Sequence, residues 1–113
     1  MNEDLPLIEV TVEATESGDK VDQDPVVVHH KSKMRWTLKP APGVQVKFDD
    51  TGFFTTKEPT DQLTKFVRID DSTVELTNKC GIKQKISYSL HVQRGGQPVS
   101  IDPIIKNDPI VEP

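Results

Sequence analysis

The stretch Ile82-Lys-Gln-Lys-Ile-Ser-Tyr-Ser-Leu-His-Val92 is the longest segment of the chain in which apolar and polar residues alternate. Successive side chains of a β-strand point to opposite faces of the sheet, so the even-numbered residues of this stretch share one face and the odd-numbered residues share the other. Apart from Gln84, the first face is apolar, whereas the second carries lysine, serine and histidine. Such a strand must bury its apolar face against a second layer, and the sequence therefore predicts a layered β protein organised around residues 82–92.

The remaining chain supplies further strands and no convincing helix. Alternating or β-branched segments are found at residues 7–14, 26–30, 34–38, 44–48, 65–69, 73–77 and 99–105, the last of them interrupted by Pro103. Turns rich in glycine, proline and aspartate separate them, and residues 17–25 have the composition of a polar loop. Short strands at this spacing predict an all-β fold, namely an antiparallel immunoglobulin-like (cupredoxin-like) β-sandwich of seven or eight strands. Trp36 falls on the inner face of its strand, and we expect it to be buried in the core.

Length and composition favour one soluble domain over residues 1–113. Charged residues make up 28% of the chain and hydrophobic residues 34%, and no apolar run is long enough for a membrane span. The N-terminus lacks the basic start and apolar stretch of a signal peptide. The single Cys80 cannot form an internal disulfide, which agrees with a reducing compartment. We therefore expect a cytoplasmic protein that makes no membrane contact.

The net charge of −4 is divided unevenly along the chain. Residues 1–25 contain eight acids and one base, whereas residues 26–113 contain thirteen bases and ten acids. Solvated charges around ordinary strands and loops explain this difference more simply than an acidic segment masking a basic surface. The sequence gives weak support for a nucleic-acid partner, and we expect none.

One row of basic residues is the best of the weak binding signals. On the strand at residues 34–38 and just before it, the outward positions are basic, and a second group lies on the strand at residues 82–92; the candidate residues are Lys31, Lys33, Arg35, Lys83 and Lys85. Together with Lys39 they could form a basic stripe for an acidic partner. The alternative is a solvated sheet face, which carries such residues routinely.

No motif of catalysis or metal binding stands out. A blue-copper site would need two histidines, a cysteine and a methionine, and the chain has the residue types in His29, His30, His91, Cys80 and Met34. Their order is unsuitable, because no methionine follows Cys80 on a closing loop. The acid pairs at 49–50 and 70–71 lack the spacing of a calcium loop, and no nucleophile elbow, phosphate loop or zinc spacing is present. We therefore expect no catalytic residue, no metal and no cofactor.

The end of the chain carries a family resemblance. Its closing block, Ser100-Ile-Asp-Pro-Ile-Ile-Lys-Asn-Asp-Pro-Ile-Val-Glu-Pro113, follows the strand that contains Tyr88. This block resembles the DP-EP family of small bacterial proteins, which is named for Asp-Pro and Glu-Pro pairs near the C-terminus. The corresponding residues here are Asp102 and Pro103, or Asp108 and Pro109, together with Glu112 and Pro113. The resemblance implies a β-sandwich and no known activity.

Two roles are open for this tail. Its prolines remove backbone donors and so prevent the last strand from presenting a continuous edge to other chains. Its four aliphatic residues, Ile104, Ile105, Ile110 and Val111, are expected to pack against the sandwich. In the alternative interpretation, the tail is a recognition element for a partner.

The function that the sequence favours is interaction rather than catalysis. We expect a non-enzymatic β-sandwich that binds an unknown protein partner or associates with itself, with a sheet edge as one route. The alternative is a small-ligand or metal-binding module that uses the loops at one end of the sandwich.

Overall fold

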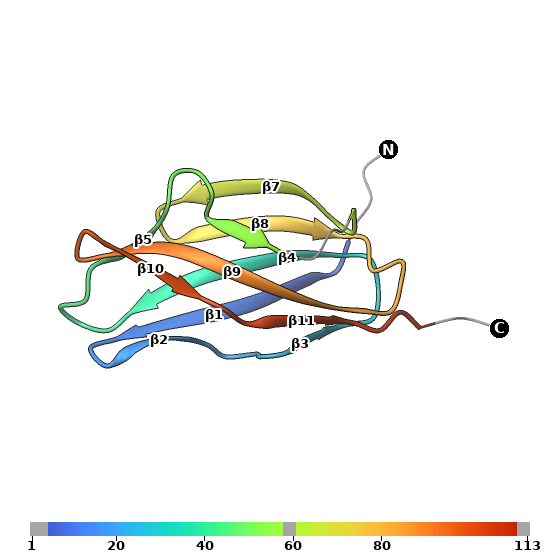
Figure 1. The fold of residues 1–113 in the computed structure, drawn as a ribbon, viewed down its shortest axis with the longest axis horizontal. Helices are drawn as coiled ribbons and strands as arrows, with labels where there is room; N and C mark the ends of the chain where they lie inside the picture. Colours follow the sequence, from blue (N-terminus) through green and yellow to red (C-terminus); the bar gives the residue numbers. More distant parts are fainter. Residues whose placement is uncertain (1–4, 58–60, 111–113) are drawn as a thin grey trace.

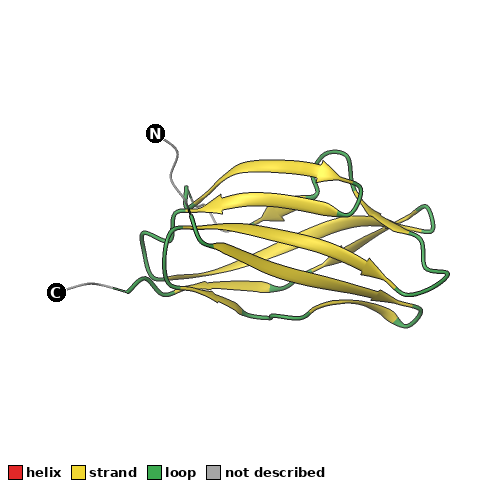
Figure 2. Cartoon of the chain, turned by 180° about the vertical axis from the view of Figure 1, so that it is seen from behind, coloured by secondary structure: helices red, strands yellow, loops and turns green. Residues whose placement is uncertain are grey.

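The fold consists of two β-sheets that face each other across one core. The computed structural model describes residues 5–57 and 61–110, and within them the chain forms eleven strands and no helix (Figures 1 and 2). The five-stranded sheet has the order β2 (Gly18–Val21), β1 (Leu7–Thr15), β4 (Ser32–Pro40), β8 (Thr73–Asn78), β7 (Leu63–Asp70). The six-stranded sheet has the order β10 (Gln97–Ile101), β9 (Gln84–Arg94), β11 (Ile104–Asn107), β3 (Val26–Val28), and β5 (Val46–Phe48) and β6 (Phe54–Thr56) also pair with β9. The described residues thus contain no helix that could cross a membrane.

Strand β9 has the predicted alternation and lies at the centre of its sheet. Its even-numbered residues from Ile86 to Val92 are buried. Val92 pairs with Phe48 of β5 on one side and with Val99 of β10 on the other, so β9 has neighbours along both edges. The predicted start of this strand at Ile82 is wrong, because β9 begins at Gln84 and Ile82 is exposed in the preceding loop.

The final extended segment is interrupted at Pro103, as the sequence predicts. Strands β10 and β11 follow one another along β9 in a single register, since Ile101 pairs with Leu90 and Ile104 with Ser87 (Figure 1). Proline has no amide hydrogen to donate to a sheet ladder, so regular pairing stops at this position. The Pro103 carbonyl still accepts from the Tyr88 amide at 3.1 Å, which keeps the two strands aligned.

Two buried aromatic side chains, Trp36 and Tyr88, lie in the core, and the partly buried Phe54 packs against them. Trp36 is fully buried, which confirms the sequence prediction, and its Nε1 donates to the Tyr88 hydroxyl at 3.0 Å. Phe54 lies stacked on Tyr88 with ring centres 4.9 Å apart. Burial raises the pKa of Tyr88, because the phenolate would lose its hydration in this environment.

A buried amide pair joins the two sheets. Asn78 of β8 and Asn107 of β11 are both inaccessible to solvent. The Nδ2 of Asn78 donates to Oδ1 of Asn107 at 2.8 Å, and the Nδ2 of Asn107 donates back to Oδ1 of Asn78 at 3.0 Å. The same Asn78 Oδ1 accepts from the amide of Cys80 at 3.0 Å. Buried polar groups need such partners, so each amide depends on the other.

Three details of the predicted sandwich are corrected by the structure. The described residues form eleven strands rather than seven or eight, because several strands are only three or four residues long. The sandwich is not purely antiparallel, since β1 pairs with β4 and β11 pairs with β3 in parallel. The predicted polar loop at residues 17–25 contains β2, which forms a hairpin with the end of β1.

The C-terminal tail packs only in part. Ile105 is fully buried and Ile104 is half-buried, as expected, but Ile110 is exposed, so the prediction for that residue is wrong. The Ile110 amide donates to the His29 carbonyl at 3.2 Å, which fixes the backbone there while the side chain faces solvent. Val111, Glu112 and Pro113 lie outside the described residues.

Candidate functional site

The edge strand β7 carries the largest concentration of exposed apolar side chains among the described residues. It pairs with β8 on one side only and forms the border of the five-stranded sheet, uppermost in Figure 1. Phe66, Val67 and Ile69 are 45%, 49% and 50% exposed. We refer to these three residues as the β7 patch. Exposed apolar groups that cluster on one edge are typical of interaction sites, whereas scattered ones are normal.

The β7 patch extends to both faces of its strand. Phe66 points toward the six-stranded sheet, where its ring packs against that of Phe54 of β6, with the two ring centres 5.4 Å apart. Val67 pairs with Glu75 of β8, whose carboxylate bonds Arg35 on the outer face of the sheet. A strand that docks beside β7 therefore meets apolar side chains on both of its faces.

Backbone irregularities shorten the regular part of β7. Its register with β8 shifts between Thr64 and Val67 and again between Arg68 and Asp70. Lys65 lies at the first shift with a φ of 56°, a left-handed conformation that non-glycine residues seldom adopt. Such bulges restrict edge pairing, and the regular part of the ladder between the two shifts consists of Val67 and Arg68.

Arg68 is turned away from this edge. Its Nη2 donates to the carboxylate of Asp71 at 2.7 Å and to the carbonyl of Phe48 at 3.2 Å, and it lies 3.5 Å from the carboxylate of Asp50. The hydrogen bond from Arg68 lowers the pKa of Asp71 below its ordinary value. The charge in the middle of β7 is thus compensated within the chain, and the β7 patch keeps its apolar character.

The other edge strands are less apolar. On the opposite border of the five-stranded sheet, β2 has the sequence Gly-Asp-Lys-Val and contains no exposed large hydrophobic residue. In β3, Val27 alone is exposed, at 45%. Charged residues and short length protect an edge from unwanted pairing, and β7 is the edge strand among the described residues that combines length with apolar exposure.

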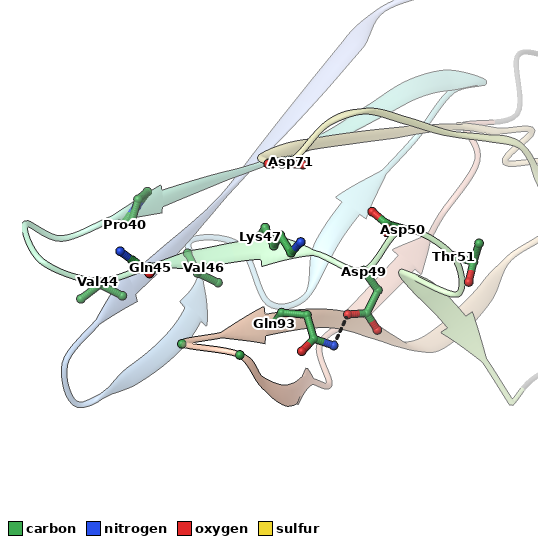
Figure 3. Close-up of a pocket in the computed structure, with 12 residues that line it drawn as sticks. Pro40, Val44, Gln45, Val46, Lys47, Asp49, Asp50, Thr51, Asp71 and Gln93 are labelled. Carbon is green, nitrogen blue, oxygen red and sulfur yellow. Dashed lines mark hydrogen bonds between the residues drawn. The ribbon is translucent and has the colours of Figure 1, made fainter.

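A hollow of about 790 Å³ lies at the end of the sandwich where β5 begins and β9 ends (Figure 3). Pro40, Val44 and Val46 form apolar parts of its lining, and the turn Gly95-Gly96 closes one side. Its volume falls in the range of small-ligand sites. This is the place where the alternative function predicted from the sequence would operate.

The acids that line this hollow already have partners within the chain. Asp49 Oδ1 accepts from Nε2 of Gln93 at 2.9 Å, the dashed bond in Figure 3, and Asp71 accepts from Arg68 at 2.7 Å. Asp50 lies on the loop after β5 and is 84% exposed. Within the described residues, no group of three or more His, Cys, Asp or Glu side chains is arranged to hold a metal ion.

The predicted basic residues are distributed over the two sheets. Lys33 and Arg35 lie on β4, in the five-stranded sheet, and Lys31 is exposed in the loop before it. Lys85 lies on β9, in the six-stranded sheet, and Lys83 is exposed just before that strand. The structure therefore does not bring the two groups together into one stripe.

The two basic groups also have different surroundings. Arg35 donates to Glu75 at 2.6 Å and to Glu9 at 3.3 Å, and the first of these bonds raises the pKa of Arg35. Lys33 lies 3.8 Å from the same Glu75 carboxylate. Acids of the neighbouring strands β1 and β8 thus compensate the charge on β4. On the other sheet, Lys85 is paired directly with Lys106 of β11.

The histidines and the cysteine lie in different parts of the fold. His29 donates from Nδ1 to the Asp108 carbonyl at 2.9 Å, next to the exposed His30. The ring of His91 lies between the hydroxyls of Thr55 at 2.7 Å and Ser100 at 3.0 Å, on the outer face of the six-stranded sheet.

Cys80 is buried, and its thiol donates to the Val28 carbonyl at 3.2 Å. Burial raises the pKa of this thiol, which therefore stays protonated at neutral pH.

The Asp-Pro pairs serve local structure. Asp102 Oδ1 accepts from the Ser89 hydroxyl at 2.5 Å, and Pro103 is buried between β10 and β11. The Asp108 amide donates to the Val28 carbonyl at 2.8 Å and so continues the pairing of β11 with β3, while Pro109 follows half-buried.

Phe66, Val67 and Ile69 are absent from the candidates predicted from the sequence. Alternation assigns one face of a strand to the core, and on that basis residues 65–69 are expected to form an ordinary half-buried strand. A usable signal is present, because the neighbours Phe66 and Val67 are both apolar and must point to opposite faces. Apolar residues at both parities are typical of a strand that is covered on both of its faces.

In comparisons with known proteins, no family model matches the chain and no curated protein matches it. The resemblance to the DP-EP family therefore stays a prediction that depends on the Asp-Pro and Glu-Pro pairs.

Proposed function

We propose that this protein is a non-enzymatic interaction module that binds a protein strand along the edge of β7. The observation that carries this proposal is the exposure of Phe66, Val67 and Ile69 on a strand that is paired on one side only. The outer edge of such a strand presents backbone donors and acceptors to a further chain, and its side chains supply specificity.

The position of Phe66 supports a docking role. Its ring is the outermost of a chain of ring contacts that runs through Phe54 to Tyr88 in the core. A half-exposed aromatic that rests on a rigid core loses little conformational freedom on binding, which is the property of an anchor residue in protein interfaces.

We also propose the finer assignments of fold, family and location. An immunoglobulin-like sandwich is supported by two sheets around one core with the tryptophan at its centre. Membership of the DP-EP family is supported by the positions of Asp102-Pro103 and Asp108-Pro109 in the last paired segment. A cytoplasmic location is supported by the single, buried, reduced Cys80.

Site-specific photo-crosslinking in the native cell tests the proposed edge. A photoreactive amino acid in place of Val67 should give covalent adducts, whereas the same group in place of Val27 should give none. Val27 is the matched control, because it is a valine of similar exposure on the edge strand β3. Equal adducts from both positions, or none from Val67, would refute β7 as the binding edge.

A small-ligand module is the second candidate function, and the hollow of about 790 Å³ favours it. A ligand that binds only the native state raises the melting temperature by mass action. Titrations with Ca²⁺, Cu²⁺ and spermidine should leave the melting temperature unchanged if β7 is the functional surface. A rise that Asp50→Asn abolishes would assign the function to the hollow.

A further inference from the structure

The hollow of about 790 Å³ borders a strand edge that has no partner strand. Strand β5 pairs with β9 on one side, and within the described residues no strand pairs with its other side. Figure 3 shows Pro40 and Asp71 on the side of β5 away from β9, whereas Gln93 lies on the side of β9. The hollow is therefore lined by an open strand edge as well as by side chains.

The hydrogen bonds around β5 show which of its backbone groups face this edge. In an antiparallel pair, alternate residues bond to the partner strand, and the residues between them point away from it. The Gln45 carbonyl accepts from the Gly95 amide at 2.9 Å. The Asp49 amide donates to the His91 carbonyl at 3.0 Å. The odd-numbered residues of this segment thus face β9, and the even-numbered residues point away from it.

Val46 is the residue whose backbone faces the hollow. The neighbouring even-numbered residue, Phe48, has partners in the five-stranded sheet: its amide donates to the Asp71 carbonyl at 2.8 Å, and its carbonyl accepts from Arg68 at 3.2 Å. The N–H and C=O of Val46 have the same orientation, but they meet the hollow instead of another strand. One such pair of groups can exchange two hydrogen bonds with one residue of an extended peptide.

The lining of the hollow favours particular side chains on such a peptide. Pro40 and Val44 offer apolar contacts, and acidic side chains outnumber basic ones in this lining. The carboxylate of Asp50 is 84% exposed, and its ion pair with Arg68 is long, at 3.5 Å. A basic group on a ligand can therefore pair with Asp50 without breaking a close contact within the chain.

We infer that the hollow binds a short extended peptide that carries a basic residue and pairs with the backbone of Val46. Pairing of an extended peptide with an exposed strand edge is a general mode of recognition. This inference rests on the second candidate function, to which it gives a ligand, and it does not depend on the β7 edge.

An NMR titration of the full chain, with resolved amide signals, tests this inference. The probe is the synthetic peptide acetyl-Val-Lys-Val-methylamide, added up to millimolar concentration. Its analogue with every backbone nitrogen methylated is the control, because it keeps the side chains and the charge but has no donor for the Val46 carbonyl. The unmodified peptide should shift the Val46 amide proton downfield in a saturable manner. The methylated analogue and spermidine should not.

Variants at position 46 separate binding from folding. Because the Val46 N–H is not part of the ladder with β9, Val46→Pro should fold, with a urea midpoint close to that of Val46→Ala. Val46→Ala keeps the N–H and should still bind the peptide. Val46→Pro should weaken binding by roughly tenfold or more, since it removes a hydrogen bond and places ring carbons there. If Val46→Pro fails to fold, the methylated peptide on the wild type carries the same test.

A second variant tests the contribution of charge. Asp50→Asn should weaken binding of the lysine peptide by about two- to fivefold, the size of an exposed ion pair. The same variant should leave binding of a peptide with norleucine in place of lysine unchanged. Equal effects on both peptides would overturn the assignment of the basic residue to Asp50.

Each result has one meaning for the inference. A saturable shift of Val46 that the methylated peptide does not reproduce supports it. It is overturned by the absence of a shift at Val46, by equal shifts with the methylated peptide or spermidine, or by unaltered binding to Val46→Pro. Shifts confined to β7 would also overturn it, while the proposed function of β7 stands. If Val46 binds the peptide but position 67 gives no crosslinks, the function of β7 is refuted and this inference stands.

Discussion

Truncation of Asn107 to alanine should destabilise the protein more than its small change in volume suggests. In the structure, Asn107 is fully buried and exchanges two hydrogen bonds with Asn78, at 2.8 and 3.0 Å. After truncation, Nδ2 of Asn78 keeps only the Met34 sulfur at 3.5 Å, while its Oδ1 keeps the Cys80 amide at 3.0 Å. One strong buried donor is therefore left without a good acceptor.

The expected cost follows from these contacts. A buried donor that loses its acceptor costs about 1–3 kcal/mol. The space left by the side-chain amide adds about 1 kcal/mol. Asn107→Ala should thus lower the free energy of unfolding by about 2–4 kcal/mol, a large part of the roughly 5–15 kcal/mol of a small domain. At roughly 4 °C for each kcal/mol, the melting temperature should fall by roughly 8–16 °C.

Urea denaturation at neutral pH is the assay, together with a double-mutant cycle. Asn78→Ala should cost more than Asn107→Ala, because it also removes the acceptor of the Cys80 amide. The double variant should be less destabilised than the sum of the single variants by about 1–2 kcal/mol. Gln93→Ala is the control, since its bond to Asp49 is only partly buried and its loss should cost less than about 1 kcal/mol. A cost below about 0.5 kcal/mol for Asn107→Ala, or strict additivity, would refute this reasoning.

Three further predictions concern the core and the ionisable groups. Tyr88→Phe should lower the free energy of unfolding by about 1–3 kcal/mol in urea denaturation, because the Trp36 indole loses its buried acceptor; an unchanged stability would contradict this. Burial raises the pKa of Cys80 above its ordinary 9.0 and that of Tyr88 above 10.0, so the native state holds these protons more tightly than the unfolded chain, and stability should fall as the pH rises above these values. Midpoints of urea denaturation, measured from neutral to strongly alkaline pH, check this. Cys80→Ala should remove the part of the stability loss that begins at the lower pH. Arg68→Gln should raise the pKa of Asp71 toward its ordinary value, and an unaltered carboxyl titration by NMR would show that the guanidinium has no such effect.

The alternation of residues 84–92 is enough to predict the central strand and its buried face. The local pattern carries this information because a strand in a two-layer fold has one wet and one dry side. The alternation does not identify, however, which strands pair with one another in a sheet. The parallel pairing of β1 with β4 depends on contacts between distant segments, and no local signal encodes it. Strand β2 escapes prediction because its Gly-Asp-Lys-Val sequence has the composition of a turn, and pairing with β1 overrides that preference.

The lack of information on strand pairing also explains why the predicted basic stripe does not form in the structure. Parity along a strand indicates which residues face solvent, but it does not say which sheet the strand joins. Parity therefore groups Lys33 with Lys85 although β4 and β9 belong to opposite layers. The β7 patch cannot be recognised without the sheet order, since Phe66 and Val67 are exposed only because β7 is an edge. The apolar character of Ile110 predicts that its side chain packs against the sandwich. In the structure, its amide donates to the His29 carbonyl, and its side chain is exposed to solvent.

Hydrogen–deuterium exchange of the full chain, alone and together with the protein that is crosslinked from position 67, tests β7 as a binding edge most directly. Amides that gain a partner strand exchange more slowly, and the effect reports on individual segments. With that partner in excess, exchange within β7 should slow relative to the free protein, while exchange in the edge strands β2 and β3 should stay the same. Exchange in β7 that the partner leaves unchanged, or an equal slowing in β2 and β3, would contradict the binding of a strand along β7.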